Sequence, residues 1–132
     1  MSTKTDLNKN GAAQAAVLAT MIGLLTLAVV NLATDTSKAV QNRVHDIGKL
    51  WMPGAAGIGP YSGKETLALV AWLLSWGILH FILRKKEWSN KVVIVIFLLG
   101  IAVATTLIWP PIFNGIAHAF NLINLESSWF NK

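Results

Sequence analysis

The chain contains no cysteine, which excludes disulfides, thiolate metal sites, iron–sulfur clusters and a cysteine nucleophile. Charged residues are also scarce, at 13% of the 132 residues, against roughly 25% in ordinary soluble domains. Hydrophobic residues make up 54% of the chain. A soluble domain of this length keeps a large share of its surface in water. The low content of charged residues and the high content of hydrophobic residues therefore predict a membrane protein.

The sequence also lacks the motifs of common catalytic and metal sites. It has no H-E-x-x-H zinc motif, no EF-hand loop, no paired-carboxylate site and no Ser, His and Asp at a spacing typical of a hydrolase. No basic patch is interleaved with aromatic residues, so we attribute the net charge of +5 to residues that flank membrane spans and not to nucleic-acid binding. We predict that the chain alone is not an enzyme and binds no nucleic acid.

Three long apolar runs dominate the sequence, over residues 12–34, 65–83 and 92–109. Each is close to the roughly 20 residues that a helix needs to cross a bilayer. The first run is too long for the core of a signal peptide, so we expect it to be retained. Pro110 and Pro111 end the third run, because proline cannot extend a helix. Lipid offers the backbone no other partner, so we predict one all-α membrane domain with three transmembrane helices.

The turn between the second and third runs, residues 84–91, sets the predicted orientation. Short basic loops stay on the cytoplasmic side of a membrane. We therefore predict that the turn and the tail over 1–11 are cytoplasmic, or stromal in a thylakoid, and that the C-terminus lies on the opposite side. We expect a bacterial or archaeal inner membrane or a thylakoid. The short turn also predicts that the second and third helices pack as an antiparallel hairpin. Four of its eight residues are basic and are candidates to bind lipid headgroups: Arg84, Lys85, Lys86 and Lys91.

The two remaining segments are predicted to lie on the membrane surface. In the link over 35–64, Val40 and Val44 belong to an apolar set at helical spacing, which indicates an interfacial amphipathic helix. Ser37 precedes this helix and is its predicted N-cap. The C-terminal segment 110–132 is predicted to form a second interfacial helix by the same reasoning.

The stretch GAAGIGPYSGKET, residues 54–66, looks at first like a nucleotide-binding loop. A P-loop requires a glycine where Ile58 stands, and a hydroxyl residue after Lys64, where the sequence has Glu65. We therefore predict no nucleotide site at 54–66. Ser62 and Glu65 instead have the spacing of a capping box directly before an apolar helix, so we predict that they cap the second span. A docking surface for a neighbouring subunit is an alternative for this loop.

Aromatic residues and one histidine recur every four residues on the second run, at Trp72, Trp76 and His80. One hypothesis is a cofactor site, with His80 as axial ligand to a haem or a chlorophyll-type pigment beside the tryptophans. The favoured alternative is a packing face, because His80 lies about 6 Å from the turn by helix rise and can reach headgroups or water. His118 is predicted at the opposite membrane surface, which disfavours a haem held by both histidines. His45 is expected to be solvated.

Small residues stand four apart on all three runs. Such spacing lets helices approach closely, which is how packing energy is gained in lipid. Together with the aromatic face they give more packing surface than one small bundle can use, which indicates a partner. The predicted packing residues are Ala15, Ala19, Gly23, Ala71, Ser75, Gly100 and Ala104.

We therefore hypothesise a small non-catalytic subunit of a larger integral membrane complex, bound to other membrane subunits and to lipids. Energy-converting complexes of photosynthetic, respiratory or monooxygenase type are the expected class by analogy. One alternative is a haem- or chlorin-binding protein that uses His80. Another is a homo-oligomeric transporter or channel, which the absence of charged residues inside the apolar stretches 12–34, 66–83 and 92–109 disfavours.

Overall fold

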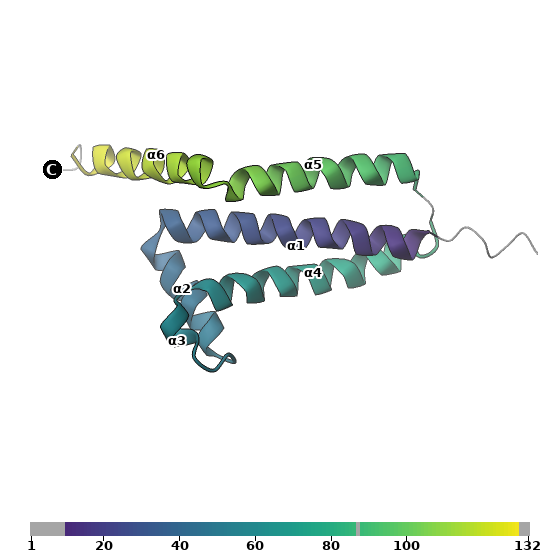
Figure 1. Ribbon diagram of the computed structural model, residues 1–132, viewed down its shortest axis with the longest axis horizontal. Helices are drawn as coiled ribbons and strands as arrows, with labels where there is room; N and C mark the ends of the chain where they lie inside the picture. Colours follow the sequence, from purple (N-terminus) through teal and green to yellow (C-terminus); the bar gives the residue numbers. More distant parts are fainter. Residues whose placement is uncertain (1–9, 87, 130–132) are drawn as a thin grey trace, which may run out of the picture.

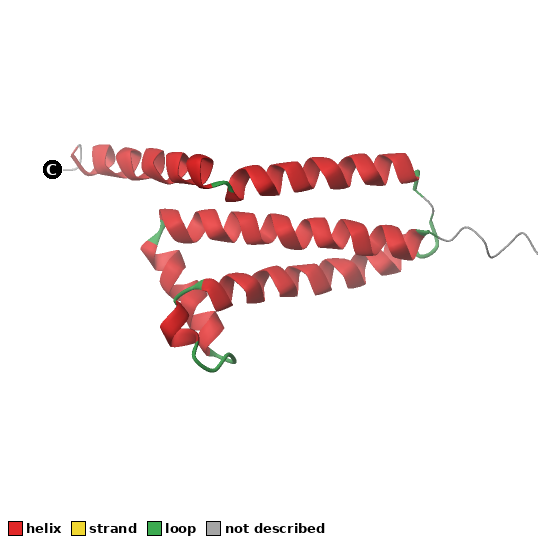
Figure 2. Ribbon diagram, in the orientation of Figure 1, coloured by secondary structure: helices red, strands yellow, loops and turns green. Residues whose placement is uncertain are grey.

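A computed structural model of the chain describes residues 10–86 and 88–129, with the side chains of these residues except 113 and 121–129. Figure 2 shows that the described chain consists of helices joined by short loops, without a strand. Its six helices are α1 (Gly11–Thr36), α2 (Lys38–Lys49), α3 (Ala55–Ile58), α4 (Tyr61–Leu83), α5 (Asn90–Ile108) and α6 (Pro110–Trp129).

Three of the helices in the described chain, α1, α4 and α5, are long and apolar enough to cross a membrane. The prediction of an all-helical chain with three such helices is confirmed. The prediction that prolines end the third apolar run also agrees with the structure, because α5 ends at Ile108 and α6 begins with Pro110 and Pro111. Proline is tolerated in the first turn of a helix, where its missing N–H would be unpaired anyway.

The arrangement of these helices differs from the predicted hairpin. In Figure 1, α5, α1 and α4 lie side by side in that order, with α1 in the middle. Among the described residues, α4 and α5 each pack along α1, and no Cα atom of α4 lies within 8 Å of a Cα atom of α5. The hairpin prediction is therefore wrong. Lys86 lies against Gly11, and Trp88 bonds to Gln14, both at the start of α1. A short turn in sequence therefore does not require its two helices to be neighbours.

The central place of α1 follows from small or compact groups on both of its sides. A Cβ at Gly23 would stand 3.0 Å from the Cβ of Trp72 on α4, and a Cβ at Gly100 of α5 would collide with the Met21 side chain of α1. Ala15 is fully buried, in a cluster with residues of all three helices: Ala15, Leu18, Leu83 and Val93. Close approach at these points lets α1 bury itself between two partners while the outer helices stay largely uncovered.

Gln14, a polar residue in the first apolar run, fastens the connection 84–89 to α1. Its side-chain amide donates hydrogen bonds to the Trp88 carbonyl oxygen, at 2.8 Å, and to Asn90 Oδ1, at 2.7 Å. Its own oxygen accepts from the Trp88 N–H at 3.4 Å. Gln14 is only 5% exposed, so these bonds satisfy a polar group that would otherwise be buried without partners.

Replacing Gln14 by leucine is expected to destabilise the chain by about 1–2 kcal/mol, since the backbone and Asn90 groups lose their partner. Thermal unfolding in detergent measures this change. Thr20→Val is the matched control, because the exposed Thr20 hydroxyl bonds only to the Ala16 carbonyl of its own helix. Equal melting temperatures for the Gln14 and Thr20 variants would contradict this role for Gln14.

Helix α2 runs across the end of α4, as Figure 1 shows. Its start agrees with the prediction, because the Ser37 hydroxyl accepts from the Val40 N–H at 3.4 Å. Val44 is buried at the crossing, and the two helices meet so closely that a Cβ at Gly63 would collide with the Val44 carbonyl oxygen. A side chain at either Gly48 or Gly63 would therefore force the helices apart.

Two polar contacts further define α2. The prediction that His45 is simply solvated is wrong. Its Nε2 lies 3.1 Å from the Ala55 carbonyl oxygen, and the residue is half-buried. Lys49 donates a hydrogen bond to an Asp46 carboxylate oxygen at 2.9 Å. This hydrogen bond and the positive charge of Lys49 hold the pKa of Asp46 below its ordinary value. The small stabilisation from this exposed pair is present at neutral pH and is lost as the pH falls through that lowered pKa.

Helix α6 follows α5 after Trp109 and packs against the C-terminal end of α1. Figure 1 shows that it leads past the end of α1, whereas α2 turns across the bundle. The end of the bundle formed by α2, α3 and α6 is thus opposite the end formed by the connection 84–89.

Candidate functional site

The predicted capping box is wrong. Helix α4 begins at Tyr61, after Pro60, and no side chain caps it. Ser62 already lies inside the helix, and its buried hydroxyl has no hydrogen-bond partner among the described residues. Glu65 is exposed. Gly59, with a φ of +69°, turns the chain so that the helix starts earlier than the capping pattern implied, and Ser62 is then used to pack closely on Gly48 of α2.

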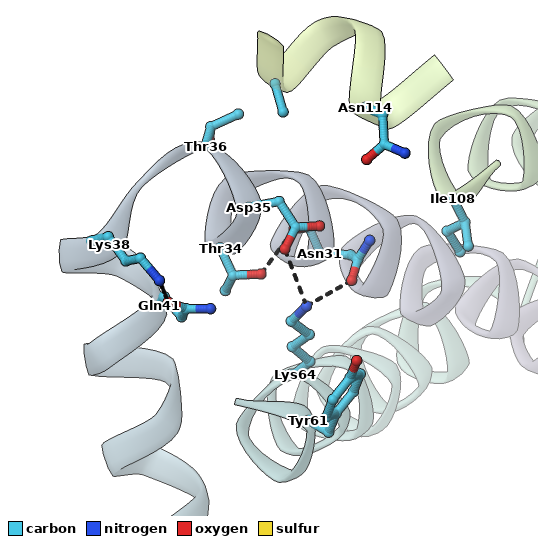
Figure 3. A pocket seen from close by; sticks show the side chains of 11 residues that line it. Asn31, Thr34, Asp35, Thr36, Lys38, Gln41, Tyr61, Lys64, Ile108 and Asn114 are labelled. Carbon is cyan, nitrogen blue, oxygen red and sulfur yellow. Dashed lines mark hydrogen bonds and ion pairs between the residues drawn. The ribbon is translucent and has the colours of Figure 1, made fainter. Parts of the chain in front are cut away.

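This earlier start places Lys64 in the first turn of α4, facing α1. The Lys64 ammonium donates a hydrogen bond to Asn31 Oδ1 at 2.7 Å and lies 4.0 Å from an Asp35 carboxylate oxygen. The Lys64 side chain is only 7% exposed. Figure 3 shows the three side chains converging between the last turns of α1 and the first turn of α4. A charged residue is therefore buried at the end of an apolar helix.

A hollow of about 780 Å³ lies beside Lys64, between the ends of five elements. The last turns of α1 and the first turns of α2 and α4 contribute most of its polar groups, and the junction of α5 and α6 contributes the rest, as Figure 3 shows. The residues that line it are Asn31, Thr34, Asp35, Thr36, Lys38, Gln41, Tyr61, Lys64, Ile108, Asn114 and Ala117.

The charges in this hollow are unequal. Lys64 and Lys38 bring two ammonium groups, and Asp35 brings one carboxylate. Lys38 lies at the exposed rim and donates to Gln41 Oε1 at 2.9 Å. The Lys64 ammonium also lies over the Tyr61 ring, 5.3 Å from its centroid, where the negative face of the ring attracts a cation. The geometry supports the binding of a polar or charged group.

Sequence reasoning missed this site because its central residues come from segments 33 positions apart. In the sequence Lys64 stands out only in the comparison with a P-loop, and the predicted second span begins after it. The predicted apolar stretches carry no charged residue, but the helices are longer than these stretches, and their ends include charged residues: Asp35 of α1, Lys64 and Glu65 of α4, and Lys91 of α5. One signal was available: Asn31 and Asp35 are four apart, which puts them on one face at the end of a helix.

The aromatic face of the second span lies away from this hollow. The Trp76 and His80 rings are tilted by 44° to one another with their centroids 5.9 Å apart, and the His80 and Phe81 rings meet edge to face at 6.4 Å. Trp72 and Trp76 are exposed, and His80 is half-buried. Whether a haem or chlorin binds here stays a prediction.

The histidines do not come together. His80 belongs to the last turns of α4, whereas His118 is exposed on α6, and Figure 1 places these segments at opposite ends of the bundle. The described residues contain no group of three or more His, Asp or Glu side chains that could hold a metal ion.

The predicted small-residue faces are used unevenly. Ala15, Ala19 and Gly23 of α1 and Ala104 of α5 are buried, whereas Ala71, Ser75 and Gly100 are half-buried. The four basic residues of the predicted turn all lie exposed at the end of the bundle opposite the hollow, at Arg84, Lys85, Lys86 and Lys91.

Comparison of the chain with protein-family models, with curated proteins and with solved structures found no match.

Proposed function

We propose that the chain is a small, non-catalytic subunit of a larger integral membrane complex. The open layer of helices carries this proposal. Among the described residues, α4 and α5 both pack on α1 but not on each other, so the three helices form a row with two broad outer faces (Figure 1). A closed three-helix bundle would gain a third interface.

Packing, and not the hydrophobic effect, drives helix association in lipid. Because the three helices lie in a row, they make fewer helix–helix contacts than a closed bundle would. Partner helices packed along the row would supply the missing contacts. Helix α4 offers features suited to such contacts. Beyond its own stretch of helix, a Cβ at Gly77 would meet no atom of the described chain within 4 Å, and Trp76 beside it is exposed. A small residue next to an aromatic one gives a partner helix both a groove and an anchor.

The surface segments supply a second set of uncovered apolar residues. Leu50 is 83% exposed, and Trp51 and Ile58 are also exposed, all in the α2–α3 region at one end of the bundle. Such residues suit either the membrane interface or the surface of a core subunit. We assign this end to the outer side of the membrane, because the basic connection 84–89 at the other end fits the cytoplasmic side. An energy-converting complex is the proposed class, by analogy.

The mass of the assembly in which the chain is found tests the proposal. A tagged copy, released in mild detergent and measured by native mass spectrometry, is expected to appear in a stoichiometric assembly with other integral membrane chains. A single species at the 14.3 kDa of the free chain would count against a subunit role. A larger species made only of copies of this chain would support the homo-oligomer instead.

A substitution at Gly77 tests the proposed docking face. Gly77→Leu is expected to leave the isolated chain folded, and to stabilise it slightly, because leucine favours a helix over glycine by about 0.5–1 kcal/mol. In the native membrane it is expected to reduce the yield of co-purified partners at least several-fold, since overpacking an interface typically destabilises it by about 1–3 kcal/mol. Gly77→Ala, which adds one methyl group, is the matched control. Wild-type yield with Gly77→Leu would show that partners do not use this face.

A further inference from the structure

The Lys64 ammonium has more donors than the protein uses. An ammonium carries three N–H groups, and one of them is taken by Asn31 Oδ1 at 2.7 Å. The Asp35 carboxylate, at 4.0 Å, attracts the charge but lies beyond hydrogen-bonding distance. No other acceptor for Lys64 Nζ lies within hydrogen-bonding distance in the described part of the chain. A cation this deeply buried favours an anionic acceptor in the adjoining hollow.

The charges of the lining point to the kind of anion. Lys64 and Lys38 against Asp35 leave a surplus of one positive charge in the hollow. One singly charged anion would neutralise it, and a dianion would be opposed by the Asp35 carboxylate. The amides of Asn31 and Asn114, also in the lining, offer further donors. A phosphodiester matches this set, because it carries one negative charge and several strong acceptor oxygens.

The position of the hollow points to the source of that phosphate. It lies where α1 ends and α4 begins, so if these helices cross a bilayer the hollow stands at the level of the headgroups. Ile108 and Ala117 add apolar side chains to its lining. A ligand with a charged head and an apolar body fits a lining of this kind.

We propose that the hollow around Lys64 binds the phosphate group of a phospholipid headgroup. Lys64 and Lys38 hold the phosphate, Asn31 orients Lys64, and Asp35 limits the site to one negative charge. This inference is independent of the proposed subunit role, because it concerns only the chain and its lipid. The competing interpretation is that Lys64 serves only to join α4 to α1 through Asn31.

Native mass spectrometry of the purified chain in detergent, titrated with phosphatidylglycerol, tests the proposal. All variants are made in an R84Q/K85Q/K86Q/K91Q background, which removes the four competing cations at the opposite end of the bundle. Lys64→Met is expected to weaken binding of the lipid about tenfold or more, and Lys38→Gln several-fold, since each removes a charge-assisted hydrogen bond. Lys49→Gln is the matched control, because Lys49 is an exposed cation of α2 paired with Asp46 outside the hollow. Its affinity is expected to stay within about twofold of the background.

Two further ligands identify the source of the phosphate. A galactosyl diacylglycerol with the same acyl chains, which lacks phosphate, is expected to bind at least tenfold more weakly than phosphatidylglycerol. Equal binding of the two lipids would overturn the proposal, and so would binding of inorganic phosphate without binding of the lipid. Because Lys38 lies at the rim, its variant tests the site even if Lys64→Met does not fold. The proposal would also be overturned if Lys38→Gln binds the lipid with unchanged affinity and Lys64→Met either binds it with unchanged affinity or does not fold.

Discussion

Replacing Asn31 by leucine is expected to destabilise the chain by about 3 kcal/mol, because the Lys64 ammonium would stay buried without its one short hydrogen bond. Leucine has the same branched shape as asparagine and is not smaller, so the loss reflects the unpaired charge and not a cavity. Thermal or denaturant unfolding in detergent measures the change. The Asp35 carboxylate, 4.0 Å away, offsets part of the loss but cannot replace the hydrogen bond.

Two companion variants separate the pair from its surroundings. Asn31→Asp keeps an acceptor opposite Lys64, so it is expected to be close to wild type in stability. The double variant Asn31→Leu with Lys64→Met removes the charge together with its partner, and is expected to lose less than the sum of the single variants. An Asn31→Leu protein as stable as wild type, or strict additivity in the double variant, would show that the buried pair contributes nothing.

Replacing Gly63 by leucine is expected to destabilise the chain by about 3 kcal/mol or more. A Cβ at this position would collide with the backbone carbonyl of Val44. Backbone cannot rotate away as a long side chain can, so α2 must shift from its seat on α4. Faster proteolysis in the segment 50–60, together with a lower melting temperature in detergent, would report this shift.

Gly57→Leu is the matched control for this substitution. Gly57 lies in α3, and a Cβ there would meet no atom of the described chain within 4 Å. The same increase in volume is therefore expected to change the melting temperature little. Equal behaviour of the Gly57 and Gly63 variants would mean that the close crossing of α2 over α4 is not a stabilising contact.

The sequence was most informative where the determining interactions are local. The three long apolar helices follow from the length and hydrophobicity of their own residues, and the N-cap at Ser37 depends on a hydrogen bond to Val40 only three positions away. Pro110 ends α5 by a steric effect that acts within one helical turn. Each of these features could be predicted because the relevant residues lie next to one another in the chain.

The errors concern contacts between distant segments. A short connection after α4 predicted a hairpin, but close approach at Gly23 of α1 seats α4 on one side of α1, and close approach at Gly100 of α5 seats α5 on the other. The pattern of Ser62 and Glu65 predicted a cap, but the turn at Gly59 moved the helix start. Local patterns show which conformations a segment allows, and tertiary packing selects among them.

The candidate site was missed for the same reason. The Lys64 side chain is a surface cation by its immediate sequence, and only the approach of α1 buries it against Asn31. Neither the hollow beside it nor the contribution of α6 to its wall has a signature in any one segment. A buried charge of this kind is found by placing helix ends together, which a single sequence does not do.

Labelling of single cysteines in intact cells tests most directly whether the three helices cross the membrane in the proposed orientation. The chain has no cysteine of its own, so each introduced thiol gives an unambiguous signal. Ala56→Cys, at an exposed position of α3, and Ser89→Cys, at an exposed position of the basic connection, mark the two ends of the bundle. A membrane-impermeant maleimide is expected to label Ala56→Cys in intact cells and Ser89→Cys only after the membrane is opened. Labelling of both positions from the same side would contradict the account.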